Sequence, residues 1–436
     1  MRPRSRLSGR VAVRGVATEA AGAPAWFTDL TERKWYEIAG GSGFGSAWQN
    51  GDRVFDVKPS NWESYGNGDI NDIVNAYTGG CASEALKEVY LPAQGGHAAY
   101  AGNEIYALKL NQAVPAWERI WGPSAVGDIT STNPGNNAAV VKNADNTPRS
   151  AHGWYQCHVD NAGRIWVGQT APQDDGTGTH QSCYWSIPRG TGDTISGSWM
   201  FHGRMYVPTT DGGDDTDLDW GSYILLQSAP GAYDSVADRI LRAPEGDATP
   251  NPPIRSWDCS DAVGFGAAAQ SGDNAIYGLN RLGTGYGTAL SSAWSVVLTN
   301  KSPRCWLVGA GSTLWYFDVE TPGSGFVSIT DTGTPAPTGT NAVYVPAHSA
   351  VYCFGTELGA TVRKLTITGS NPTTASYAWS DLTNNSGSAT PANVDAGTYN
   401  GTYSKAQGIV DMGNGQAALV IAANVEGQTF VYKLPP

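Results

Sequence analysis

Residues 75–121, NAYTGGCASEALKEVYLPAQGGHAAYAGNEIYALKLNQAVPAWERIW, contain four short runs in which apolar and polar residues alternate. The runs are Asn75–Tyr77, Glu88–Pro92, Glu104–Leu110 and Trp117–Trp121. Alternation with a period of two is typical of strands that bury one face, and the Gly and Asn residues between the runs are typical of turns. The segment is therefore predicted to form a four-stranded antiparallel sheet, and both faces of such a sheet can be buried only if the unit recurs.

The unit does recur along the chain. Modules with similar runs span residues 150–204, 223–281, 290–330, 340–385 and 402–434, and the last of these supplies only three runs. The run Lys34–Ala39 (KWYEIA) has no partner nearby in the sequence and has the shape of a closing run. If it completes the last module, the sheets close into a ring that leaves only short edges exposed.

These modules predict an all-β fold: a six-bladed β-propeller that is closed by an N-terminal strand. A seventh blade would require a further sheet within residues 123–149 or 254–290. The composition agrees with many short strands joined by tight turns, since the 436 residues include 55 Gly, 16 Trp and 20 Tyr. Few windows show the apolar spacing of an amphipathic helix.

Charge divides the chain into two parts, an N-terminal arm (residues 1–24) and the propeller (residues 25–436). The net charge is −12, but the first 14 residues carry five Arg and no acid, which leaves 22 basic against 39 acidic residues, or −17, for the rest. The arginines of this extended basic arm, predicted to anchor it, are Arg2, Arg4, Arg6, Arg10 and Arg14. An acidic body repels nucleic acid, so an acidic protein groove is the expected partner of the arm.

Compartment signals are few. No run of 18 apolar residues is present, so no membrane span is expected. Arg14 and Glu19 interrupt the apolar part of the N-terminus, which argues against a signal peptide. The six Cys form no CxxC pair and most fall in strand-like runs, so they are expected to be free thiols of a protein made in a reducing cytoplasm.

Several residues resemble the motif of a known family. A paired glycine that ends the second strand, a following Tyr and a Trp that opens the fourth strand resemble the kelch motif of kelch and galactose-oxidase-type β-propellers. The first module carries it as Gly95-Gly96, Tyr106 and Trp117. A looser version in the fourth module consists of Gly309-Ala310-Gly311, Tyr316 and Phe326. The resemblance implies a kelch-like propeller in which these residues are architectural.

A second resemblance concerns the start of the chain. PAWFTDLTERKWYEIAG (residues 24–40) together with AQGGHAAYAGNEIYAL (residues 93–108) resembles propeller proteins from the structural genes of tailed bacteriophages, prophages and gene-transfer-agent-like particles. It implies a virion component of the head, a tail fibre or a spike, present in several copies and made in the bacterial cytoplasm. The arm would contact other virion proteins, and the propeller would meet polysaccharide on the host surface.

Aromatic residues outside the strand-like runs are candidates for glycan binding. They are Trp48, Trp62, Tyr65, Trp121 and Trp220. Aromatic faces pack well against the C–H surfaces of sugars, while neighbouring Asp and Asn residues supply hydrogen bonds. The alternative is that these rings fill space between blades, as we expect for the tryptophans within the strand-like runs.

Metal sites and catalysis have weaker signals. Five acids in one short loop, with glycines between them, are suited to Ca²⁺: Asp211, Asp214, Asp215, Asp217 and Asp219. A solvated acidic loop is the alternative. His152 and His158 would lie ~20 Å apart on one strand, too far to share a copper ion. No GxSxG, HExxH or P-loop motif is present.

The sequence therefore favours a non-enzymatic glycan-binding virion protein; the alternatives are a glycan-active or galactose-oxidase-like enzyme and a purely structural decoration protein.

Overall fold

The structure is a computed structural model of the whole chain, and it describes most of the propeller. The described residues are 22–40, 46–66, 73–74, 79–92, 100–129, 143–148, 150, 153, 155–170, 182–190, 199–205, 230–243, 254–259, 279–283, 293–321, 325–391, 405–423 and 429–436. They contain 25 strands and only short helices, which confirms the all-β propeller fold.

The first three sheets follow the predicted modules. Sheet 1 consists of β2 (Cys81–Ser83), β3 (Glu88–Pro92), β4 (Ile105–Lys109) and β5 (Ala116–Trp121). Sheet 2 consists of β6 (Cys157–Val159), β7 (Arg164–Thr170), β8 (Ser182–Pro188) and β9 (Met200–Met205). Sheet 3 consists of β10 (Gly231–Asp234), β11 (Arg239–Arg242), β12 (Ile254–Asp258) and β13 (Leu279–Gly283). Within each of these sheets the strands pair antiparallel in chain order.

The remaining strands form three more sheets. Sheet 4 consists of β14 (Trp294–Leu298), β15 (Cys305–Ala310), β16 (Thr313–Asp318) and β17 (Val327–Ile329). Sheet 5 consists of β19 (Asn341–Val345), β20 (Ala350–Phe354), β21 (Val362–Thr368) and β22 (Ser376–Leu382), with β18 (Asp331–Thr332) as a fifth strand parallel to β22. Sheet 6 consists of β23 (Ala406–Ile409), β24 (Ala418–Ala422), β25 (Thr429–Lys433) and β1 (Trp35–Ile38).

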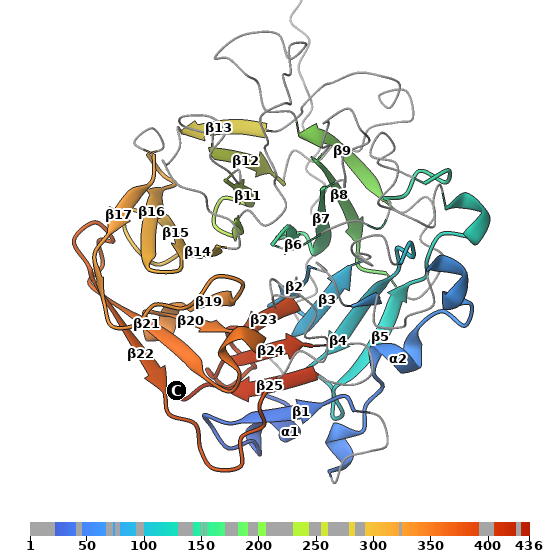
Figure 1. Cartoon of the computed structure of the whole chain (residues 1–436), viewed down its shortest axis with the longest axis horizontal. Helices are drawn as coiled ribbons and strands as arrows, with labels where there is room; N and C mark the ends of the chain where they lie inside the picture. Colours follow the sequence, from blue (N-terminus) through green and yellow to red (C-terminus); the bar gives the residue numbers. More distant parts are fainter. Residues whose placement is uncertain are drawn as a thin grey trace, which may run out of the picture.

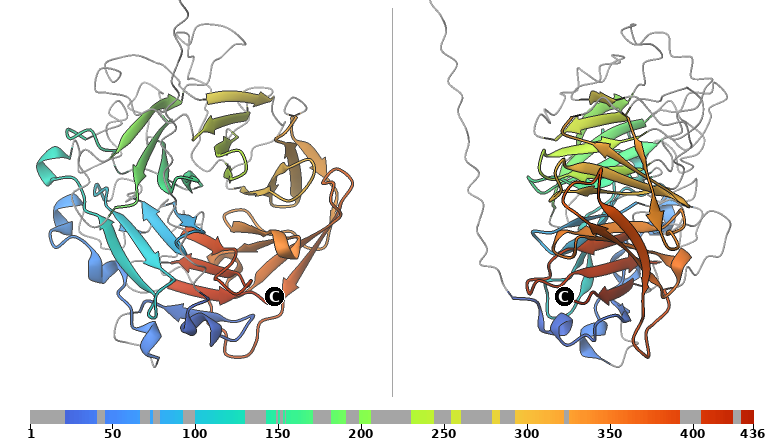
Figure 2. Two further views of the ribbon diagram at one scale, coloured as in Figure 1. Left: turned by 180° about the vertical axis from the view of Figure 1, so that it is seen from behind. Right: turned by 90° about the vertical axis from the view of Figure 1, so that its left-hand side faces the viewer.

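The sheets follow one another around a central axis in chain order (Figure 1). The strands nearest the axis are β2, β6, β10, β14, β19 and β23. Seen edge-on, the ring is thinner than it is wide (Figure 2). The helices are single turns in the loops: α1 (Ala25–Thr28), α2 (Val54–Val57), η2 (Ala47–Gln49), η3 (Trp62–Tyr65), η5 (Val126–Asp128), η9 (Pro346–His348) and η10 (Thr356–Leu358). None of the described helices is long and apolar enough to cross a membrane.

Strand β1 closes the ring, as the sequence predicts. It pairs antiparallel with β25, and Trp35 lies opposite Tyr432 in the register. One face of β1 packs Trp35 against Phe354 of sheet 5, while on the other face Ile38 joins an apolar cluster shared with sheet 1. The N-terminal strand therefore connects sheets 5, 6 and 1 through side chains as well as through its own hydrogen bonds.

A repeated cation joins neighbouring sheets. Arg164 and Arg239 each begin the second strand of a sheet, and Lys301 lies in the turn between the first two strands of sheet 4. Each donates to a backbone carbonyl that follows the third strand of the next sheet: Arg164 to Cys259, Arg239 to Val319 and Lys301 to Gly369. Three consecutive sheet interfaces are thus linked by the same arrangement of a side-chain cation and a strand-end carbonyl.

Two details of the strand prediction differ from the structure or lie outside the described residues. The run Asn75–Tyr77 lies outside the described residues, and the first strand of sheet 1 is Cys81–Ser83 instead. The two segments considered for a further blade add no sheet: the described residues of 123–149 form no strand, and β12 and β13 belong to sheet 3. The free-thiol prediction agrees with the five described cysteines, which are all buried and unbridged.

Candidate functional site: the central pocket

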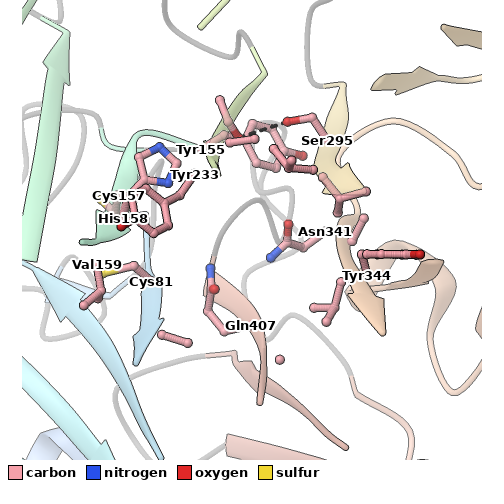
Figure 3. A pocket seen from close by; sticks show the side chains of 18 residues that line it. Cys81, Tyr155, Cys157, His158, Val159, Tyr233, Ser295, Asn341, Tyr344 and Gln407 are labelled. Atoms are coloured by element: carbon pink, nitrogen blue, oxygen red, sulfur yellow. Dashed lines mark hydrogen bonds between the residues drawn. The ribbon is translucent and has the colours of Figure 1, made fainter. Parts of the chain in front are cut away.

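A pocket of about 240 Å³ lies where the innermost strands converge on the axis (Figure 3). Its walls come from the first strand of every sheet: β2, β6, β10, β14, β19 and β23. Because each wall belongs to a different sheet, the pocket exists only when the ring is closed.

Polar side chains of the lining tie neighbouring sheets together. Ser295 of β14 donates its hydroxyl to the carbonyl of Gly231 in β10, at 2.9 Å. Gln407 of β23 donates to the carbonyl of Gly80, which directly precedes sheet 1, also at 2.9 Å. Asn341 of β19 donates its amide to the carbonyl of Ala406 at the start of sheet 6. The lining is therefore held in place by hydrogen bonds that cross from sheet to sheet.

The Tyr155 side chain lies across the end of the pocket at which the innermost strands begin. Its hydroxyl donates to the carbonyl of Thr340 at 2.8 Å, and Thr340 directly precedes β19. Sheets 2 and 5 lie on opposite sides of the ring, so this bond spans the axis. The chain at Tyr155 also approaches β10 closely: a Cβ on Gly231 would lie 2.7 Å from the Tyr155 carbonyl oxygen, so this position requires glycine.

His158 is the titratable imidazole of the lining. It lies in the centre of β6 with 8% of its surface exposed, and burial, helped by the nearby Arg242, lowers its pKa to about 3. Its Nε2 atom has no hydrogen-bond partner among the described residues and faces β10, 3.5 Å from the place of a Cβ on Gly231. At neutral pH the pocket thus contains an uncharged imidazole with an unused hydrogen-bonding atom.

The remaining chemistry of the lining is neutral. Three tyrosines line the pocket (Tyr155, Tyr233 and Tyr344), together with two thiols, Cys81 and Cys157. Burial raises the pKa of the Cys81 thiol well above its usual range, so this group stays protonated. Within the described part of the chain, no group of three or more His, Cys, Asp or Glu side chains is placed to hold a metal ion. The arrangement is suited to hydrogen bonding with an uncharged ligand.

Three of the loop aromatics proposed for glycan binding belong to or border one apolar cluster outside the pocket. Trp48 stacks on Trp26 with ring centroids 5.8 Å apart, and Trp62 is a half-buried neighbour of the same apolar cluster. Tyr65 is only 3% exposed and donates its hydroxyl to the carbonyl of Ser124 at 2.9 Å. Tyr65 thus fills the core, whereas Trp48 and Trp62 keep part of their surface in solvent.

Trp121 has a packing role between sheets 1 and 2. Its Nε1 donates to the carbonyl of Pro188 at 2.9 Å, and its ring lies so close to Gly190 that a Cβ there would come within 2.1 Å. The other predicted site residues lie outside the described residues: Trp220, the five acids Asp211, Asp214, Asp215, Asp217 and Asp219, and the five arginines of the arm. Calcium binding by the acidic loop stays a prediction.

Part of the kelch-like pattern is buried in the architecture, namely Tyr106, Trp117 and Gly309, whereas Tyr316 and Phe326 are half-buried. Tyr106 donates to Glu104 at 2.8 Å, and Trp117 donates to the Thr429 hydroxyl of sheet 6 at 3.0 Å. In the fourth module a Cβ on Gly309 would lie 2.1 Å from the ring of Trp294, so the glycine makes room for that ring. Gly95 and Gly96 lie outside the described residues.

Sequence reasoning missed most of the pocket. Of the two histidines considered for copper, His158 lines the pocket and His152 lies outside the described residues; a third histidine, His348, is hydrogen-bonded to Tyr352 at 2.8 Å. Tyr155, Asn341 and Gln407 were not singled out. They do share a signal, because each lies in or just before the first run of its module, and in a propeller this is the run nearest the axis.

The chain resembles known proteins in structure but not in sequence. No protein-family model matches the chain, and no curated protein matches it. The major allergen Mala s 1 of Malassezia sympodialis is similar over 84% of this chain and 94% of its own, at 9% identity and a TM-score of 0.44. A chain of the mitotic checkpoint complex is similar over 85% and 90%, at 10% identity and a TM-score of 0.40. An α-L-arabinofuranosidase from Fusarium graminearum is similar over 68% and 72%, at 8% identity and a TM-score of 0.37.

Proposed function

We propose that the chain is a non-enzymatic recognition propeller that is carried on a virion and binds a glycan of the host surface. The observation that carries the binding proposal is the central pocket, whose lining combines three tyrosines with amide, hydroxyl and imidazole groups. Specific small-molecule sites typically combine apolar walls with a few well-placed polar groups. A neutral ligand with many hydroxyl groups is the class that this lining suits best.

Binding is tested with the purified full chain and a panel of bacterial surface polysaccharides and their oligosaccharides, immobilised as an array. We expect saturable binding to at least one glycan class, with no release of reducing ends from it over hours. Release of new reducing ends would favour the alternative of a glycan-active enzyme. Failure of the folded protein to bind any glycan, with incorporation into particles intact, would favour the purely structural decoration protein.

The virion context is supported by the resemblance of residues 24–40 and 93–108 to phage, prophage and gene-transfer-agent propeller proteins. A kelch-like ancestry fits the buried positions of Tyr106 and Trp117. We propose that the basic arm, residues 1–24, anchors the propeller to other virion proteins. Several copies on one particle would then present their pockets together, which increases the strength of attachment to a repetitive surface.

Anchoring is tested by deleting residues 2–20, which precede the first described residues of the propeller. We expect the shortened chain to keep the melting temperature of the full chain and to be lost from purified particles, because five arginines are removed with the segment. A matched variant with these five arginines replaced by glutamine separates charge from length. Normal incorporation of the deletion variant would refute anchoring by the arm.

A further inference from the structure

We infer that the central pocket takes one terminal, uncharged sugar residue of a glycan, and that His158 is the specificity-determining residue that recognises one of its hydroxyl groups. This inference rests on the proposed glycan binding and adds the ligand class, the mode of entry and the residue that selects the ligand. Three properties of the described residues lead to it: size, charge and an unpaired atom.

Size limits what can enter. At about 240 Å³ the pocket is smaller than the ~300 Å³ at which typical small-molecule sites begin. Its walls come from all six innermost strands and surround the axis, so it is open to solvent but differs from a groove that runs across the surface. The hydrogen bond between Tyr155 and Thr340 further narrows the pocket at the end where the innermost strands begin. A single sugar residue at the end of a chain can enter such a pocket, whereas an internal residue would need an exit on both sides.

Charge excludes ionic ligands. Among the described residues, the lining contains no Asp, Glu, Lys or Arg, so a charged ligand would be buried there without an opposite charge from them. The imidazole of His158 does not supply one, since burial and the nearby Arg242 hold its pKa at about 3. Uronic and sialic acids and amino sugars with a free ammonium group are therefore disfavoured, and neutral hexoses, deoxyhexoses and N-acetylhexosamines are favoured.

The unpaired Nε2 atom identifies His158 as the residue that selects the sugar. His158 is 92% buried, as its exposed fraction is 8%, and its Nε2 has no hydrogen-bond partner among the described residues. A buried polar atom without a partner is unfavourable. The atom is covered beside Gly231, so a ligand hydroxyl pairs with it only if the β10 backbone at Gly231 moves aside, and the pair then satisfies it. Sites that pair a buried polar group with a ligand hydroxyl discriminate strongly against the analogue that lacks it.

The first experiment measures calorimetric affinities of methyl glycosides of neutral hexoses, deoxyhexoses and N-acetylhexosamines. Each sugar that binds is compared with an oligosaccharide in which the same residue is internal. We expect the methyl glycoside to bind and the internal residue to bind at least tenfold more weakly. Equal affinity for terminal and internal residues would overturn the mode of entry.

The second experiment compares His158→Ala with His348→Ala, a histidine of η9 that does not line the pocket. We expect His158→Ala to weaken binding at least tenfold and His348→Ala to change it less than twofold. Affinities for monodeoxy analogues of the sugar distinguish a direct contact from a merely structural role of His158. Removal of one hydroxyl should weaken binding to the wild type at least tenfold and leave binding to His158→Ala unchanged, as expected when that hydroxyl pairs directly with His158.

Failure of the inference can be told apart from failure of the proposed function. If the wild type binds glycans on the array but His158→Ala binds them equally well, the inference is wrong and the proposed function stands. If the wild type binds no glycan, both fail. Should His158→Ala not fold, the deoxy series on the wild type decides alone. Affinity should also stay constant between pH 8 and pH 5, because His158 remains neutral throughout this range; a steep change there would contradict its assigned role.

Discussion

Replacing Trp35 by alanine is expected to lower the free energy of unfolding by about 3–5 kcal/mol, the range typical of a buried Trp→Ala change. Trp35 is fully buried in the strand that closes the ring. It contacts Tyr432 within its own sheet and Phe354 in sheet 5, and its Nε1 donates to the carbonyl of Ala360 at 3.0 Å. The substitution removes the contacts through which the first strand connects two sheets, and urea unfolding followed by circular dichroism measures the loss.

The control for Trp35→Ala is Val236→Ala. Val236 lies in the turn after β10 and is 60% exposed, so its truncation should change stability by less than about 0.5 kcal/mol. An effect of Trp35→Ala as small as that of the control would mean that β1 does not hold the ring closed.

Asp234→Ala is expected to destabilise the fold by about 3–5 kcal/mol, because it removes the buried carboxylate between two largely buried guanidinium groups. Of the two, Arg304 keeps a second carboxylate, that of Glu320 at 3.3 Å. The Asp234 side chain is completely buried and lies 3.1 Å from Arg239 in its own sheet and 3.0 Å from Arg304 in sheet 4. Arg239 also donates to Val319 of sheet 4, so loss of the carboxylate should weaken the contact between sheets 3 and 4. Thermal and urea unfolding measure the change.

The control for Asp234→Ala is Asp381→Ala. Asp381 pairs with Arg363 at 2.8 Å, but its side chain is 55% exposed, and exposed ion pairs contribute about 0–1 kcal/mol. Similar effects of the two substitutions would contradict the view that the buried ion-pair network, rather than surface charge, holds the neighbouring sheets together.

The ring could be predicted because its signals are local. Alternation of apolar and polar residues marks a strand wherever it occurs, and the module boundaries follow from the turns between the runs. Even the non-local closure could be inferred: the last module lacked one strand and Lys34–Ala39 lacked a partner. The run Asn75–Tyr77 lies outside the described residues, and the first strand of sheet 1, Cys81–Ser83, was not predicted because three residues carry little information.

The pocket could not be predicted because its residues belong together only in space. Tyr155 and Thr340 are 185 positions apart in the sequence, yet their hydrogen bond crosses the axis of the ring. The loop aromatics were equally ambiguous, since a tryptophan outside a strand run has the same sequence signature whether it packs or binds. Trp121 shows the packing outcome, because its indole bonds to the neighbouring sheet. The sequence presents His158 as a possible copper ligand. Its burial and its unpaired Nε2 depend on the neighbouring strands and could not be inferred from the sequence.

A crystal structure of the protein with its tightest-binding methyl glycoside tests most directly whether the centre of the ring is the ligand site. We predict that the sugar lies in the pocket between the six innermost strands, with a hydroxyl oxygen within hydrogen-bond distance of His158 Nε2. Sugar density only on the outer surface, for example against the partly exposed rings of Trp48 and Trp62, with none in the pocket, would contradict this assignment.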